Sequence, residues 1–128
     1  MRFPENLKYT KDHEWAKAEG AQVTVGITDH AQSALGDIVF VELPKVGRVL
    51  KAGETFGVVE SIKAVSDLYA PISGKVTAVN EGVVAEPSTL NRDPHSSAWL
   101  VKIEITEPTA LDALMDSKKY SAFVETLK

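Results

Sequence analysis

The chain has 128 residues, of which 44% are hydrophobic, so it suits one domain that buries a core without a disulfide or a structural metal. Its net charge of −4, with 14 basic residues spread along the chain, argues against nucleic-acid binding, and the absence of cysteine excludes a disulfide framework, a thiolate metal site and a cysteine nucleophile. No apolar run approaches the roughly 20 residues of a membrane span. We therefore expect a cytoplasmic, single-domain protein over residues 1–128 that does not enter a membrane, although a mature organellar protein would have a similar composition.

The first predicted element is a β-hairpin over residues 13–27. Apolar and polar residues alternate from Val23 to Ile27, as they do in a half-buried strand. Glu19 and Gly20 lie just before this run and supply a turn. The pattern therefore predicts two antiparallel strands near the N-terminus.

A short helix is predicted next, over DHAQSAL at residues 29–35. Thr28 or Asp29 can cap it, and Gly36 can end it. Residues 37–43, DIVFVEL, then read as a strand that is apolar on both faces. Such a strand is expected to lie in the centre of a sheet.

Residues 56–69 predict a second hairpin, whose tip lacks the usual turn residues. FGVVES and VSDLY are rich in β-branched and aromatic residues, which leaves only Ile62, Lys63 and Ala64 to turn the chain. None of these is the Asn, Asp or Gly that tight hairpins favour. A lysine amine at such a tip can be acylated to carry a flexible arm, or it can be one of the chain's 11 solubilising lysines. Position alone leaves both interpretations open.

Two β units with similar sequences flank this hairpin. Residues 47–60 and 74–86 each place a Gly-x-Val segment, a turn and a Gly-Val-Val segment in that order. The similarity predicts a small quasi-two-fold β-sandwich. WLVKIEI at residues 99–105 alternates as a last strand, and PTALDALM at 108–115 and SKKYSAFVETLK at 117–128 predict two short C-terminal helices packed on the sheet.

Catalytic chemistry within the chain has little support. His13, His30 and His95 have no partner at metal-ligand spacing. Asp93 and His95 lie together in DPHSSAW, but catalytic triads assemble from distant segments. There is also no glycine-rich phosphate loop. We therefore expect a non-enzyme with no catalytic residue and no metal site.

Three long motifs resemble the glycine cleavage system H protein family. They are YTKDHEW at residues 9–15, VGITDHAQSALGDIVFVELP at 25–44 and GETFGVVESIKAVSDLYAPISGKV at 53–76. The resemblance continues through NRDP and WLVKIEI into the C-terminal residues. It implies a mainly β fold with short helices, the lipoyl/biotinyl-type flattened β-sandwich or barrel-sandwich hybrid, with an N-terminal hairpin, a short internal helix and C-terminal helices. It also implies a lipoyl carrier without an active site of its own.

The resemblance assigns roles to particular residues. Lys63 in ESIKA would carry lipoic acid in amide linkage, and Glu60, Gly47 and Gly74 match positions that lipoylating enzymes read. Glycines suit that role because they allow turns and a close approach of another backbone.

Two acidic residues are candidates for contact with the loaded arm, whose end carries a cationic amine. Glu14 in DHEW matches the carboxylate that would hold the amine in this family, and Asp67 in VSDLY is a second acid near the root of the arm. A carboxylate stabilises an ammonium group through charge-assisted hydrogen bonds.

The resemblance further implies partner enzymes for a monomeric shuttle. A pyridoxal-phosphate glycine decarboxylase would load an aminomethyl group derived from glycine, a tetrahydrofolate-dependent aminomethyltransferase would remove it, and dihydrolipoamide dehydrogenase would reoxidise the dithiol. A lipoate ligase or a lipoyl/octanoyl transferase would attach the cofactor.

Other functions remain open on the sequence alone. The chain could relay lipoyl groups to other lipoyl proteins, belong to the lipoyl or biotinyl domains of another multienzyme complex, or be an unmodified interaction module. Biotin acceptors usually carry Met on both sides of the lysine, where this chain has Ile62 and Ala64. The family usually continues NxDP with an aromatic residue and a glycine, whereas this chain has HSSA at residues 95–98. We expect a loop of different shape there and assign no partner contact to it.

Overall fold

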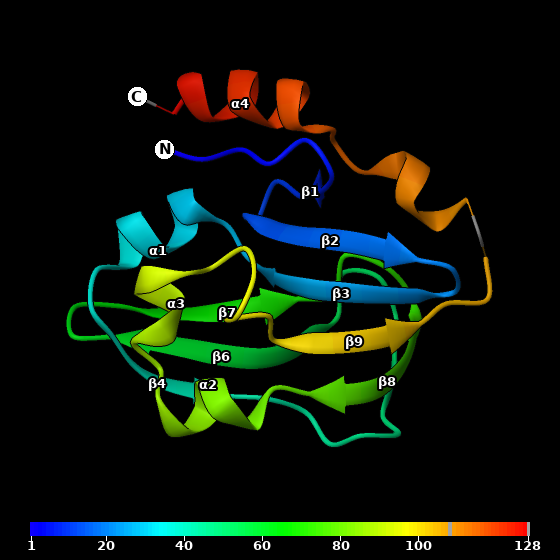
Figure 1. The fold of residues 1–128 in the computed structure, drawn as a ribbon, viewed down its shortest axis with the longest axis horizontal. Coiled ribbons are helices and arrows are strands. Elements are labelled where there is room, and N and C mark those ends of the chain that lie inside the picture. The colour runs from blue at the N-terminus through cyan, green and yellow to red at the C-terminus, as the bar shows by residue number, and fades with distance from the viewer. Residues whose placement is uncertain (108, 128) are drawn as a thin grey trace.

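Two antiparallel β-sheets pack face to face in the computed structural model, which describes residues 1–107 and 109–127 (Figure 1). In the six-stranded sheet the order is β1 (Lys8–Tyr9), β2 (Glu14–Glu19), β3 (Gln22–Ile27), β9 (Val101–Glu104), β8 (Gly74–Val79) and β5 (Val49–Leu50). The three-stranded sheet has the order β4 (Ile38–Glu42), β6 (Thr55–Ser61) and β7 (Val65–Tyr69). The mainly β sandwich expected from the sequence is confirmed, and neither sheet closes into a barrel.

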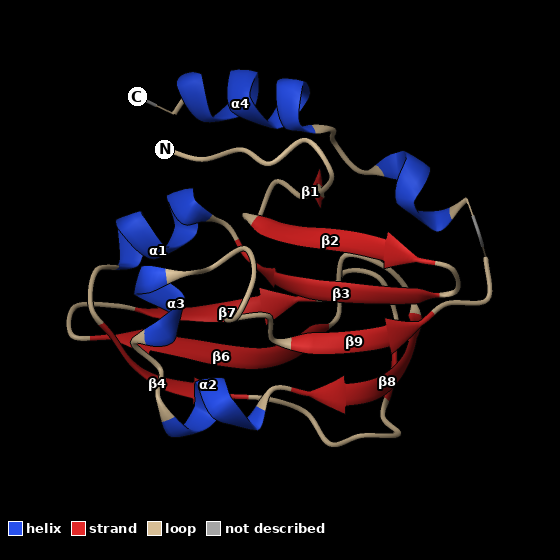
Figure 2. Cartoon of the chain, in the orientation of Figure 1, coloured by secondary structure: helices blue, strands red, loops and turns tan. Residues whose placement is uncertain are grey.

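Short helices lie around the strands (Figure 2). They are α1 (Asp29–Leu35), α2 (Glu81–Ala85), α3 (Thr89–Arg92), the 3₁₀ helix η1 (Ala110–Ala113) and α4 (Ser117–Glu125). Thr28 caps α1, since its Oγ1 accepts a hydrogen bond from the backbone N–H of Ala31, and Gly36 ends the helix with a φ of 80°. No helix in the described ranges is long and apolar enough to cross a bilayer.

The main core lies between the two sheets. Alternating residues of β3 and β9 pack against inward-facing residues of β6 and β4 in one buried cluster. Its central members include Val25, Ile103, Val59 and Val41. This packing holds β6 in place along its length and leaves the β6–β7 turn to project at the left edge of Figure 1.

The expected central position of residues 37–43 is wrong. β4 is an edge strand of the three-stranded sheet, and Val39 and Phe40 are largely exposed. The register shifts between Ile38 and Phe40, which marks a β-bulge. The apolar residues on both faces of β4 therefore do not indicate burial on both faces.

The predicted second β unit is also wrong in its later half. Residues 81–85 form α2 because Asn80 caps them: its Oδ1 accepts a hydrogen bond from Gly82 N, and its Nδ2 donates to the carbonyl of Trp99 at 2.7 Å. The local cap outweighs the strand propensity of Val83 and Val84. The internal similarity therefore reflects common residue types and not a structural repeat.

Helix α4 packs beside β1, away from the main core, whereas Leu111 of η1 belongs to that core. In α4, Tyr120 stacks on Tyr9 with ring centroids 4.5 Å apart, and the two residues share a second buried cluster with Leu7, Trp15 and Val124. The N-terminal segment runs alongside α4 in Figure 1. The two predicted helices included Pro108 and Lys128, which lie outside the described residues.

Candidate functional site at the hairpin turn

Lys63 lies in the β6–β7 turn with its side chain exposed. Ile62 and Lys63 are the two residues between Ser61 and Ala64, whose backbones are joined by a hydrogen bond from Ser61 N to Ala64 O at 2.8 Å. Among the described non-glycine residues only His13 has a positive φ. The turn is therefore neither type I′ nor type II′, the two types whose twist matches a hairpin.

The side chain of Ser61 supports this turn. Its Oγ accepts hydrogen bonds from Ala64 N at 3.0 Å and Lys63 N at 3.3 Å, and the residue is only 9% exposed. A serine hydroxyl in this position replaces the turn-forming side chain of Asn or Asp. Ser61 is not among the residues predicted from the sequence, although a serine directly before a two-residue turn is a recognisable pattern.

A second support is the segment between α1 and β4. Ile62 N donates to the carbonyl of Asp37 at 3.0 Å. The Lys63 side chain lies over Gly36, since a Cβ built on that glycine would be 3.4 Å from Cε of Lys63. Gly36 thus gives the lysine stem a flat backbone surface.

Asn91, in the NRDP motif, holds this supporting segment. Its Nδ2 donates to Gly36 O at 2.8 Å and to Gln32 Oε1 at 3.1 Å, and its Oδ1 accepts from Ile38 N at 2.9 Å. One side chain therefore fixes the residues on which the lysine turn rests. This contact is not predictable from the sequence pattern, because Asn91 and Gly36 are distant in sequence.

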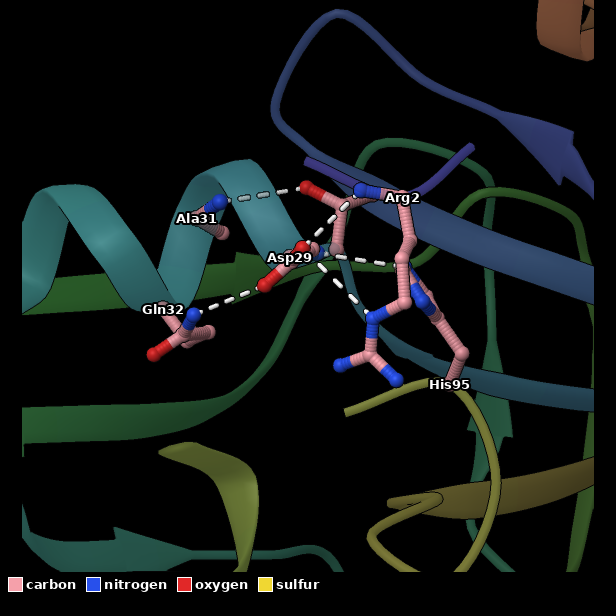
Figure 3. Close-up of polar contacts among 6 residues, drawn as sticks. Arg2, Asp29, Ala31, Gln32 and His95 are labelled. Carbon is pink, nitrogen blue, oxygen red and sulfur yellow. Dashed lines mark hydrogen bonds and ion pairs between the residues drawn. The ribbon is translucent and has the colours of Figure 1, made fainter. Parts of the chain in front are cut away.

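The divergent loop at residues 95–98 holds the other end of α1 (Figure 3). Asp29 N donates to His95 Nε2 at 3.1 Å, and the Asp29 carboxylate accepts from Arg2 N at 3.0 Å and from Gln32 Nε2 at 2.8 Å. Burial lowers the pKa of His95, and since Nε2 accepts, the neutral ring carries its proton on Nδ1. His95 is therefore a structural residue of the loop.

The other two histidines also have structural roles, because their rings pack against each other and His13 contacts Tyr120. The rings of His13 and His30 are 4.5 Å apart, and His13 Nδ1 lies 2.8 Å from the hydroxyl of Tyr120. That hydroxyl lies 2.7 Å from Thr28 Oγ1, and burial lowers the pKa of His13. In the part of the chain that the structure describes, no group of three or more His, Cys, Asp or Glu side chains is arranged to hold a metal ion.

Glu60 and Asp67 lie on the outer face of the three-stranded sheet, close to the turn. Glu60 is paired with Phe40 on one side and Val65 on the other, and Asp67 is paired with Val58. Paired residues of neighbouring strands point to the same face. Neither carboxylate makes a hydrogen bond or ion pair with another side chain within residues 1–107 and 109–127, so both are available to other molecules.

Glu14 is placed very differently, because it is buried at the opposite end of β7 and is 1% exposed. Its Oε1 accepts from Thr10 Oγ1 at 2.7 Å, and its Oε2 accepts from Tyr69 N at 3.2 Å. Burial raises the pKa of Glu14 to about 7, although the two hydrogen bonds act in the opposite direction. The structure does not bring Glu14 to Lys63, and only an extended arm along the hairpin would connect them.

Gly47 and Gly74 lie at the end of the hairpin opposite Lys63, and each has a local reason to be glycine. Gly47 has a φ of +98°, and its N–H donates to Val76 O at 2.8 Å. A Cβ on Gly74 would lie 2.4 Å from the carbonyl oxygen of Glu104 in β9. Backbone conformation explains Gly47, and close approach between strands explains Gly74.

Comparison with known proteins identifies the family to which this exposed lysine turn belongs. The profile of the family described as Glycine cleavage H-protein matches residues 7–127. The chain belongs to the glycine cleavage H-protein family. The glycine cleavage system H protein of Anaeromyxobacter sp. (strain K) is 56% identical over 125 residues, which cover 98% of each chain, and that of Koribacter versatilis (strain Ellin345) is 57% identical over 123 residues, covering 96% of this chain and 94% of the other.

A solved structure supports the same assignment. The crystal structure of a glycine cleavage system H protein from Mycobacterium marinum superposes with a TM-score of 0.87 at 44% identity, and covers 95% of this chain and 98% of that one. Members of the glycine cleavage H-protein family carry lipoate. This chain is therefore the lipoyl shuttle subunit of a glycine cleavage system, a carrier and not a catalyst on its own.

Proposed function

We propose that Lys63 is the residue on which this carrier bears lipoic acid, in amide linkage, within one lipoyl-carrier domain over residues 1–128. The observation that carries the proposal is the turn itself, which exposes Lys63 on a backbone fixed by Ser61 and supported by Gly36. The exposed side chains of Ile62 and Val65 beside it suit contact with an acyl chain. The residues present therefore fit a lipoyl group.

The attached group supplies a disulfide that can accept the aminomethyl group of glycine and a dithiol that can be reoxidised. The residues of the chain itself hold the lysine outward and keep its backbone in one shape, so that an enzyme can enclose it. A lysine amine is protonated at neutral pH and must lose a proton before it is acylated. Because no hydrogen bond or ion pair joins Lys63 to a carboxylate in the part of the chain that the structure describes, the modifying enzyme must supply the base.

The partners we propose are a pyridoxal-phosphate glycine decarboxylase, a tetrahydrofolate-dependent aminomethyltransferase and dihydrolipoamide dehydrogenase, with a lipoate ligase or a lipoyl/octanoyl transferase attaching the cofactor. The carrier would act as a monomer in the cytoplasm. Each partner has to reach the same exposed turn, so the carrier serves them one at a time.

We propose that Glu60 is read directly by the lipoylating enzyme, since its carboxylate lies on the exposed face three residues before Lys63. Gly47 and Gly74 would act at a distance, by shaping the opposite end of the domain that such an enzyme also contacts. Their local structural roles support an effect on shape more than a direct contact with the lysine.

For the loaded arm, we propose contacts with Glu14 and Asp67. A carboxyl group with a pKa of about 7 is partly protonated near neutral pH, and a nearby ammonium would favour its ionised form. Glu14 can therefore bind the cationic end of the arm in exchange for its bond with Thr10 or Tyr69. Asp67 is exposed on the hairpin and needs no such exchange.

The test is glycine-dependent release of carbon dioxide by the decarboxylase in the presence of lipoylated carrier. We expect the wild type and the matched control Lys118→Arg, at an exposed helix position, to stimulate release equally. Lys63→Arg should give no stimulation. Full stimulation by Lys63→Arg would contradict the assignment of the lysine. A lipoylated wild type that leaves the decarboxylase inactive but passes its lipoyl group to a second lipoyl protein would indicate a relay.

A further inference from the structure

Exposed apolar side chains gather around the lysine turn. Val39 is 55% exposed, Phe40 44%, Ile62 72% and Val65 67%, and these are four of the nine large hydrophobic residues found exposed in the described chain. Phe40 and Val65 flank Glu60 in register, so their side chains share the outer face of the three-stranded sheet. An apolar patch of this kind on a small domain marks an interaction surface.

The same face is acidic. Glu42 and Asp67 flank Val58 in the next row of the sheet, and Glu60 lies in the row with Phe40 and Val65. Residues 37–42 and 58–67 together contain four carboxylates, Asp37, Glu42, Glu60 and Asp67, and Lys63 as their only cation. Amide formation at Lys63 removes that cation, so the loaded carrier presents carboxylates around an apolar centre.

The edge of this sheet does not favour pairing with a strand of another protein. The bulge between Ile38 and Phe40 interrupts the ladder at β4, the strand that carries Phe40. Bulges on edge strands discourage the addition of a further strand. A partner would therefore contact this face through side chains.

Building on the proposed function, we propose that this outer face, centred on Phe40 and Val65 and bordered by Glu42, Glu60 and Asp67, is the docking surface for the glycine-decarboxylating enzyme. That enzyme has to hold the phosphate of pyridoxal phosphate and the carboxylate of glycine, both anions, so the entrance to its active site should be positively charged. A basic rim around an apolar contact is complementary to the acidic border and apolar centre of the carrier. Docking here directs the Lys63 arm into the enzyme.

The experiment measures KM and kcat of the decarboxylase for lipoylated carriers whose modification has been confirmed by intact mass. Phe40→Thr and Val65→Thr test the apolar centre against Val49→Thr, which alters an exposed valine on the other sheet. Glu42→Lys tests the acidic border against Glu19→Lys, an exposed glutamate at the β2–β3 turn. Unlipoylated forms of the same variants serve as competitive inhibitors, a measurement that does not depend on modification.

We expect the three variants of the face to raise KM about fivefold or more with little change in kcat, and the two control variants to stay within about twofold of wild type. KM of the wild type should rise with salt, and Glu42→Lys should show a weaker salt dependence. Unlipoylated variants of the face should inhibit more weakly than the unlipoylated controls.

Two results would overturn the docking surface while the carrier function stands. One is a set of face variants that match their controls in KM and in inhibition. The other is a wild-type dimer that Phe40→Thr dissociates, which would assign the face to self-association. A lipoylated wild type that does not stimulate the decarboxylase would instead overturn the proposed function, and the docking surface with it.

Discussion

The two ends of the β6–β7 hairpin differ in which side chains they expose and which they bury. At the turn, side chains are exposed while the backbone is fixed by Ser61 and, through residues 36–38, by Asn91. At the other end a carboxylate, Glu14, is buried and joins β2 to the end of β7. The comparison shows that the exposed end depends on polar contacts to the backbone, whereas the buried end keeps an ionisable group at an energetic cost.

The largest effect on stability is expected at the buried end. The pKa of Glu14 rises from 4.5 to about 7 on folding, so between these pH values the folded protein keeps a proton that the unfolded chain has released. The free energy of unfolding should therefore fall as pH rises through this window, by roughly 3 kcal/mol in total, and stay level above it. In Glu14→Gln this decrease should be absent, and urea unfolding at pH 8 should show a more stable protein than wild type. A variant with the same decrease as wild type would show that another group titrates.

At the turn end, Asn91→Ala should cost about 2 kcal/mol, since it leaves Ile38 N–H and Gly36 C=O without their partner. The rate of lipoylation should also fall, because the segment supporting Lys63 loosens. Gln22→Ala is the control, since its side chain makes one exposed hydrogen bond, to Thr77. Equal stability of the two variants in urea unfolding would contradict the supporting role of Asn91.

Two glycines at the end of the domain opposite Lys63 allow an effect on backbone conformation to be distinguished from recognition by the lipoylating enzyme. Gly47 and Gly53 have φ values of +98° and +87°, and a Cβ on either would meet no atom within 4 Å. Alanine should therefore destabilise the fold by a similar amount at both positions, about 1 kcal/mol. If lipoylating enzymes read Gly47, only Gly47→Ala should slow lipoylation measured by intact mass. Equal rates for both variants would remove Gly47 from the recognition site.

A change in stability as small as that of the glycine variants is expected for the turn hydroxyl. Ser61→Ala should cost about 1 kcal/mol because Ala64 N–H and Lys63 N–H lose their acceptor. Its effect on lipoylation should exceed its effect on stability, since the shape of the turn is what the enzyme reads. Ser66→Ala, on the neighbouring strand, removes a hydroxyl that makes only a 3.4 Å contact with the carbonyl of Asp67 and should leave both measurements unchanged.

The sequence predicted those elements whose formation depends on residues within or directly beside them. The hairpin strands follow from residue type and alternation, and α1 follows from Thr28 and Gly36 at its ends. The prediction for β4 was wrong because apolar residues such as Phe40 also occur at exposed positions of an edge strand, and residue type alone does not distinguish these from core positions.

The remaining features depend on contacts between distant segments. The helix at residues 81–85 depends on Asn80, whose side chain also binds the carbonyl of Trp99. The bonds of Asn91 to residues 36–38 and the burial of Glu14 against Tyr69 join segments far apart in sequence. Periodicity does not report such contacts, so the sequence indicated Lys63 but not what fixes it in place.

The role of Lys63 is tested most directly by identifying which lysine is modified. The purified chain would be incubated with lipoate, ATP and a lipoate ligase, and the modified peptide identified by tandem mass spectrometry. We predict one lipoyl group per chain, on Lys63, with the other ten lysines unmodified. A lipoyl group on any other lysine, or an unchanged mass with an active ligase, would contradict the assignment of Lys63 as the lipoyl-bearing residue.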